Sequence, residues 1–186
     1  PQLGENIGAA ARGMANFGLS DLRLIKPRDG WPNERANVMA VGASYVLDDA
    51  RVFPTLKDGI GDLQFVLATT ARGRGFAKQI YTPEAGVKLL RDAIARGERC
   101  GILFGNERTG LENDEVSLAS AVITIPTSEE FSSINLGQAV LLIAYEWFKS
   151  GDATPGYKLE HGPNAQKATR EEMFQLFEHL EGELLA

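Results

Sequence analysis

The sequence is poor in the residues that most often carry metal binding or covalent catalysis. It contains one cysteine, Cys100, and two histidines, His161 and His179, which both lie in the C-terminal part. A single cysteine forms no internal disulfide, and there is no CxxC pair for zinc. These absences disfavour a Ser–His or Cys–His catalytic pair and a histidine-rich metal site. We expect Cys100 to be a small core residue of a buried strand, in a reducing and therefore cytoplasmic environment.

Long apolar runs and the common phosphate-binding loops are absent as well. Without about 18 consecutive apolar residues, no membrane span is predicted, and the opening PQLGENIG lacks the features of a signal peptide. The sequence has neither GxxxxGK[ST] nor GxGxxG, which disfavours a P-loop, a dinucleotide site and a conventional Rossmann methyltransferase site. The chain opens without Met on a turn-like segment, which is compatible with a further strand before residue 1.

An excess of positive charge is also missing. The chain has 19 Lys and Arg against 25 Asp and Glu, a net charge of −6. Residues 152–186 hold three of these cations and seven of the acidic residues, so residues 1–151 are close to neutral. Binding of nucleic acid by bulk charge is disfavoured, and an RNA surface must be a local patch. The best candidate is segment 71–78, whose cations are Arg72, Arg74 and Lys78.

Apolar, β-branched runs alternate with helical patterns along the chain, which predicts an α/β fold with a mainly parallel sheet. We expect strands at residues 22–26, 45–47, 64–70, 101–104 and 122–125. We expect helices at residues 7–17, 33–41, 83–96, 112–119 and 135–148.

Local signals predict the ends of the helices and of the domain. Asn6 is a candidate N-cap of the first helix, and Gly18 stands where a C′ glycine belongs. Residues 151–168 are rich in Gly, Pro, Asn, Lys and Thr and are predicted to be a linker. The sequence therefore predicts one main domain at 1–150, followed by the linker and by an amphipathic helix at 169–186.

Three polar loops that contain glycine follow three consecutive predicted strands, at residues 69–74, 105–110 and 126–135. Open α/β sheets bind ligands beyond the carboxyl ends of their strands. We therefore expect these loops to converge on one pocket.

The same loops carry a resemblance to a known family. NIGAAARGMANFG (6–18), LFGNERTGL (103–111) and IPT…SSINLGQAV (125–140) resemble, in order and spacing, three motifs of the TrmH/SpoU family of SPOUT RNA methyltransferases. ATTAR at 68–72, SSINLGQAV with the following AYE, and FEHLEGELL in the tail are most similar to the TrmJ type.

The resemblance implies a SPOUT α/β fold with a C-terminal trefoil knot and a homodimer. It also implies 2′-O-ribose methylation of RNA by S-adenosyl-L-methionine, with a tRNA anticodon-loop nucleotide as the favoured target and RNA as the partner. For the cofactor it implies the residues Thr70, Ala71, Leu103, Phe104, Gly105, Gly110, Ile125, Ser133, Ile134 and Leu136. For catalysis it implies Arg12, Glu107, Asn135, Ser133 and Asn6, and for RNA binding Arg12, Arg72, Arg74, Lys78 and Arg108. No metal is implied.

Several roles have competing interpretations. The guanidinium of Arg12 stays protonated above about pH 12, so phosphate binding and stabilisation of an alkoxide suit it better than a role as base. Glu107 would accept a hydrogen bond from the ribose, orient Arg12, or face backbone N–H groups at a helix start. Asn135 would contact the substrate or be only an N-cap. The cations of segment 71–78 and Arg108 would bind phosphates or be solvated.

The function itself has alternatives. Within the family, the target would be rRNA in place of tRNA. A non-catalytic RNA-binding protein that keeps the fold is a second alternative. A small-molecule α/β enzyme is disfavoured because its expected phosphate loops are missing.

Overall fold

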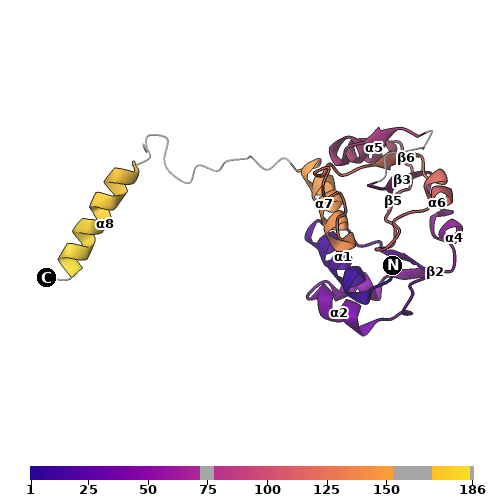
Figure 1. The fold of residues 1–186 in the computed structure, drawn as a ribbon, viewed down its shortest axis with the longest axis horizontal. Helices are drawn as coiled ribbons and strands as arrows, with labels where there is room; N and C mark the ends of the chain where they lie inside the picture. The colour runs from indigo at the N-terminus through magenta and orange to yellow at the C-terminus, as the bar shows by residue number, and fades with distance from the viewer. Residues whose placement is uncertain (72–77, 153–168, 185–186) are drawn as a thin grey trace. The chain divides into compact units, whose positions relative to one another are not determined.

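A computed structural model describes residues 1–71, 78–152 and 169–184 of the chain (Figure 1). The chain divides into two compact units, Pro1–Asp152 and Ala153–Ala186. The second unit contains the helix α8 (Arg170–Leu184). Most of the predicted linker lies outside the described residues, and the domain limits taken from the sequence stay a prediction.

All strand pairs of the first unit are parallel. β1 (Arg23–Ile25) and β2 (Arg51–Phe53) form one sheet. The second sheet has the order β4-β6-β3-β5, with the bounds Ile80–Tyr81, Ala121–Ile123, Phe65–Thr69 and Cys100–Leu103. The predicted α/β fold with a mainly parallel sheet is confirmed.

Helices cover the sheets. The helices of the first unit are α1 (Gly4–Asn16), α2 (Glu34–Ala40), α3 (Ser44–Asp48), α4 (Leu56–Ile60), α5 (Pro83–Ala95), α6 (Asn113–Ser117) and α7 (Leu136–Lys149). Figure 1 shows α7 and α1 on one flank of the unit, and α4 and α6 on the opposite flank.

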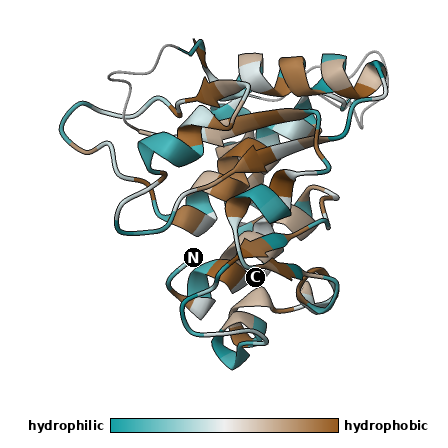
Figure 2. Ribbon diagram, turned by 90° about the vertical axis from the view of Figure 1, so that its right-hand side faces the viewer, coloured by the Kyte–Doolittle hydropathy of each residue, from teal (hydrophilic) through white to brown (hydrophobic). Residues whose placement is uncertain are grey.

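The central strand β3 contributes to both faces of its sheet because successive side chains point in opposite directions. Val66 packs in a cluster with Val116 of α6, whereas Leu67 packs with Leu90 of α5 and Ile143 of α7. The apolar strands accordingly run through the interior of the unit (Figure 2). This packing brings the carboxyl ends of β3, β5 and β6 to one edge of the sheet.

Helix α1 is flanked closely by α2 and α7. A Cβ atom on Gly8 would lie 2.2 Å from the carbonyl oxygen of Ala36, and one on Gly137 would lie 2.7 Å from the Cβ of Ala9. Glycine is needed at both contacts because any side chain would force the helices apart. The side chain of Arg12 on α1 remains exposed.

The structure confirms most predicted helix ends. The side chains of Asn33, Thr82 and Asn135 cap α2, α5 and α7, and Gly18 follows α1 with a φ of 71°. The prediction that Asn6 is the N-cap of α1 was wrong, because the helix begins at Gly4 with Leu3 as its N-cap. Leu3 has no capping side chain, and no side chain of the described residues caps the first turn of α1.

Residues 45–47 were expected to be a strand and instead lie in the helix α3. A three-residue apolar run does not distinguish the two states, and burial of Val46 and Leu47 against Ala11 and Ala40 selects the helix. The short elements β2, α4 and β4 were not predicted, because two to five residues carry too little periodicity.

Candidate active site

Three segments that lie far apart in the sequence are joined by the side chains of Asn6, Glu107 and Asn135, here called the Asn6 cluster. The Asn6 Nδ2 donates to Glu107 Oε1 at 3.0 Å, and the Asn135 Nδ2 donates to Asn6 Oδ1 at 2.9 Å. Asn6 is the buried polar residue of the described core, with 8% of its surface exposed. The cluster therefore links the start of α1, the loop after β5 and the start of α7.

Glu107 holds the N-terminus of α1. Its carboxylate accepts hydrogen bonds from the backbone N–H groups of Gln2 at 2.7 Å and Leu3 at 3.0 Å. A carboxylate at this place is favoured by the unpaired N–H groups and positive dipole of a helix start. Glu107 thus fixes the N-cap residue Leu3 and the residue before it, whereas an N-cap side chain would accept from Glu5 or Asn6.

These contacts also determine the charge of Glu107. Partial burial acts to raise its pKa, but the hydrogen bonds from Asn6 and from backbone N–H groups outweigh burial and lower the pKa below its ordinary value. Glu107 is therefore ionised at neutral pH, and both of its oxygens are occupied.

Asn135 has two roles at once. Its Oδ1 accepts from the N–H groups of Gly137 at 2.9 Å and Gln138 at 3.3 Å, which confirms the predicted N-cap of α7. Its Nδ2 binds Asn6. The carboxamide of Asn135 is oriented correctly for both sets of bonds, because its oxygen faces the two N–H donors and its nitrogen faces the acceptor oxygen of Asn6.

The loop after β5 is held by Asn106, which sequence reasoning did not single out. Its Oδ1 accepts from the N–H groups of Arg108 and Thr109, and its Nδ2 donates to Thr109 Oγ1 and the carbonyl of Gly110. An Asn followed by polar residues and a Gly is the signal that predicts such a turn. A Cβ atom on Gly105 would lie 2.1 Å from the carbonyl carbon of Gly110, so a glycine is needed at this position for the loop to close.

The two other predicted catalytic residues are exposed. Arg12 lies on α1, six residues beyond Asn6, which corresponds to about 9 Å along the helix axis. Within the described parts of the chain, no side chain forms a hydrogen bond or ion pair with Arg12. Ser133 is exposed in the loop before Asn135. Arg12 and Ser133 are thus accessible, whereas the side chains of Asn6 and Glu107 are engaged in the hydrogen bonds that join the segments of the site.

The loops that follow β3, β5 and β6 are bound to one another. The N–H of Thr70 donates to the carbonyl of Ile123 at 3.1 Å, and its carbonyl accepts from Thr124 Oγ1 at 3.0 Å. Thr69 Oγ1 donates to the carbonyl of Leu103 at 2.8 Å. The predicted cofactor residues of these loops, Leu103, Phe104, Gly105, Ile125, Ile134 and Leu136, are all half-buried.

A mainly apolar cavity of about 750 Å³ lies along β1 and the edge strand β5. Among the predicted cofactor residues it touches Leu103, Phe104, Gly105 and Leu136 at one end, but neither Thr70 nor the residues 125–134. Most of this cavity therefore lies away from the three loops, and we do not equate it with a cofactor site.

The predicted RNA-binding cations have different environments. Arg72 and Arg74 lie outside the described residues, and Arg108 is exposed. The ammonium of Lys78 donates to the carbonyl oxygens of Ser117, at 2.7 Å, and of Ala119, at the end of α6. An RNA contact by Lys78 would compete with these bonds.

In the described ranges, no group of three or more His, Cys, Asp or Glu residues is arranged to hold a metal ion. Across the same ranges, no helix is long and apolar enough to span a membrane.

Comparisons with known proteins identify the family of this chain. The sequence model of the SpoU rRNA methylase family matches residues 1–145. The chain is 41% identical over 150 residues to the tRNA (cytidine-2′-O-)-methyltransferase TrmJ of Methanocaldococcus jannaschii, covering 78% of this chain and 63% of the relative. It is 37% identical over 152 residues to the uncharacterized tRNA/rRNA methyltransferase LasT of Escherichia coli, covering 78% of this chain and 64% of that protein.

The chain thus spans less than two thirds of the length of these two relatives. The crystal structure of TrmJ from Z. mobilis superimposes with a TM-score of 0.76 at 49% identity, over 99% of this chain and 76% of that structure. A family model that matches most of the chain, the three joined motif segments and the shared fold lead to one conclusion: this chain belongs to the SpoU rRNA methylase family.

Proposed function

We propose that this protein transfers the methyl group of S-adenosyl-L-methionine to a ribose 2′-OH of RNA, with tRNA as the favoured substrate. The observation that carries the proposal is the Asn6 cluster, which unites the three motif segments at the carboxyl-terminal edge of the sheet, on the same helix as the exposed Arg12. The M. jannaschii relative, which is named as a tRNA 2′-O-methyltransferase, supports tRNA as the target.

The predicted cofactor residues fit the chemistry of this methyl donor. Leu103, Ile134 and Leu136 are half-buried apolar side chains that would pack against an adenine ring. Every residue of the predicted cofactor set is uncharged, so a sulfonium cation meets no like charge among them. When bound, S-adenosyl-L-methionine would supply an activated methyl group. The proposed set is completed by Thr70, Ala71, Phe104, Gly105, Gly110, Ile125 and Ser133.

The roles of the catalytic residues follow from which side chains are accessible. Arg12 would bind the phosphate of the target nucleotide and stabilise the developing alkoxide, because its guanidinium cannot accept a proton. Glu107 is unsuited to act as base, since its oxygens accept three hydrogen bonds and its pKa is lowered. The proton would pass to a phosphate oxygen or to water. Ser133, and the remaining N–H of Asn135, would donate to the ribose or phosphate.

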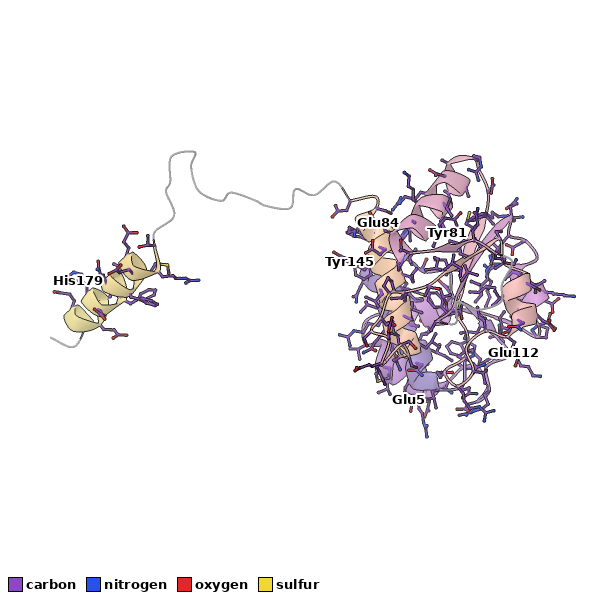
Figure 3. All side chains as sticks on the ribbon, turned by 45° about the horizontal axis from the view of Figure 1, so that its top comes forward. Glu5, Tyr81, Glu84, Glu112, Tyr145 and His179 are labelled. Atoms are coloured by element: carbon purple, nitrogen blue, oxygen red, sulfur yellow. The ribbon has the colours of Figure 1, made fainter. Side chains whose placement is uncertain are left out.

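We also propose a homodimer that buries the outer face of α7. Leu142, Tyr145 and Phe148 are 41%, 47% and 47% exposed on this face, and Tyr145 stands on the outer side of the helix (Figure 3). Phe17, the C-cap residue that follows α1, continues the face, with its ring 5.8 Å from that of Tyr145. Exposed apolar patches of this kind mark association sites. The trefoil knot and a cytoplasmic location belong to the same proposal.

The test is incubation with labelled S-adenosyl-L-methionine and tRNA transcripts, followed by alkaline hydrolysis. A 2′-O-methyl group blocks cleavage at that nucleotide, so label in an alkali-resistant dinucleotide is the expected result. A matched transcript with a 2′-deoxy sugar at the mapped nucleotide should accept no methyl group. If the methyl group is transferred to rRNA and not to tRNA, the proposed substrate changes from tRNA to rRNA. Absence of cofactor binding by calorimetry would favour the non-catalytic RNA-binding protein.

A further inference from the structure

Lys26, the residue that follows β1, has an unusual backbone. Its φ is 42°, and over residues 1–71, 78–152 and 169–184 no other non-glycine residue has a φ in the left-handed region. Side chains other than glycine are disfavoured there, and such conformations are retained where the surrounding structure imposes them, often at functional sites. The N–H of Lys26 donates to the carbonyl of Phe53 at 2.9 Å, which holds the residue in place.

The turn that begins at Lys26 lies against the Asn6 cluster. The N–H of Arg28 donates to the carbonyl of Pro1 at 3.2 Å, and the next residue, Gln2, donates its N–H to Glu107. Glu107 is also close enough to act electrostatically on the Arg28 guanidinium. Two backbone contacts thus place this turn beside the loop of Glu107.

The charges of this turn leave one cation uncompensated. Arg28 is exposed and forms a two-point ion pair with Asp29, at 2.8 and 3.2 Å. Lys26 is exposed, and its ammonium has no hydrogen-bond or ion-pair partner in the part of the chain that the structure describes. Glu107, the acidic residue of the Asn6 cluster, already accepts three hydrogen bonds.

We propose that Lys26, assisted by Arg28, binds a phosphate of the RNA backbone beside the active site. This inference rests on the proposed function. An acidic chain with a net charge of −6 needs local cations to hold RNA, because phosphate contacts supply most of the affinity. The ammonium of Lys26 is compact and exposed, and the turn fixes the backbone of Lys26 beside the Asn6 cluster.

The experiment measures tRNA affinity of the full chain at several salt concentrations for Lys26→Gly, Lys26→Arg and Lys88→Ala. Glycine adopts the φ of residue 26 freely, so Lys26→Gly removes the cation without strain, and thermal melting checks that it folds. Lys88 is an exposed cation in the middle of α5 and controls for loss of one charge.

Lys26→Gly should bind tRNA about fivefold more weakly at 0.15 M salt, with a salt slope reduced by about 0.9, as expected for one lost phosphate contact. Lys26→Arg should retain the affinity, and Lys88→Ala should bind like wild type. Unchanged affinity and slope in Lys26→Gly would overturn the inference, as would an equal loss in Lys88→Ala. Arg28→Ala, which should weaken binding by a smaller factor, provides a second variant if Lys26→Gly does not fold.

The outcome is separable from the proposed function. If wild type methylates tRNA and Lys26→Gly shows the same tRNA affinity and salt slope, only the role of Lys26 is refuted. Wild type that neither binds nor methylates any RNA refutes the proposed function itself.

Discussion

Asn6→Ala tests whether the Asn6 cluster holds the site together. The change removes one hydrogen bond to an ionised carboxylate, worth about 1.5–3 kcal/mol, and one between neutral amides, worth about 0.5–1.5 kcal/mol. Glu107 keeps its bonds to Gln2 and Leu3, and water reaches Asn135, so part of the loss is offset. We expect the free energy of unfolding to fall by about 2–4 kcal/mol.

For a unit of this size, each kcal/mol corresponds to roughly 2–4 °C, so Tm should fall by about 4–16 °C. Circular dichroism melts at pH 7.5 measure this shift. The matched control is Asn16→Ala, an exposed position at the end of the same helix, which should melt within about 2 °C of wild type. If Asn6→Ala melts like Asn16→Ala, the cluster does not stabilise the site and our reading of it is refuted.

A second variant, Asn6→Asp, tests the same cluster through the pH dependence of its Tm. The aspartate still accepts from Asn135, but it places a second carboxylate next to Glu107 where the wild type has a donor. Two adjacent carboxylates repel until one binds a proton, so its folded-state pKa is raised. The deficit in Tm should therefore be largest at pH 7.5 and shrink as the pH falls towards 5. A deficit that does not depend on pH would contradict this account.

Three further predictions concern single residues. The pKa of Glu107 is lowered on folding, so its contribution to stability is present above its unfolded pKa of about 4.3 and is lost as the pH falls through the folded pKa. The Tm gap between wild type and Glu107→Gln should therefore narrow progressively as the pH falls below about 4.3, and a gap that stays constant would contradict this. Arg12→Ala should lower kcat by about 10²–10³-fold while calorimetry shows nearly unchanged cofactor affinity, and near-normal turnover would remove Arg12 from the mechanism. Leu142→Glu, on the exposed face of α7, should halve the mass measured by light scattering; a monomeric wild type, or a variant of unchanged mass, would exclude that dimer face.

Local signals in the sequence predicted much of the fold. Thr82 followed by Pro83 marked the start of α5, Gly18 marked the end of α1, and Asn135 marked the start of α7. These features depend on one or two neighbouring residues, whose conformational preferences act over a single turn. The motif order likewise predicted the family, because it is a property of the sequence alone.

The failures have a common cause. Asn6 looked like an N-cap because its type and place fit, yet the helix begins at Gly4 and Asn6 instead donates to Glu107, about a hundred residues further along the chain. Val46 and Leu47 looked like a strand, yet burial against Ala11 and Ala40 makes that segment helical. In both places a contact distant in sequence outweighed the local preference.

In the site, too, some properties follow from the sequence and others from contacts between distant residues. The sequence alone determined which residue types stand at each loop, and therefore the family and the chemistry available. Only the tertiary structure decided that Asn6 and Glu107 form a hydrogen bond with one another and that Glu107 also binds the residues at the start of α1, while Arg12 remains exposed. The physical reason is that a side chain's role depends on which partners satisfy its donors and acceptors, and those partners are chosen by packing across the sheet edge rather than by neighbours in the chain.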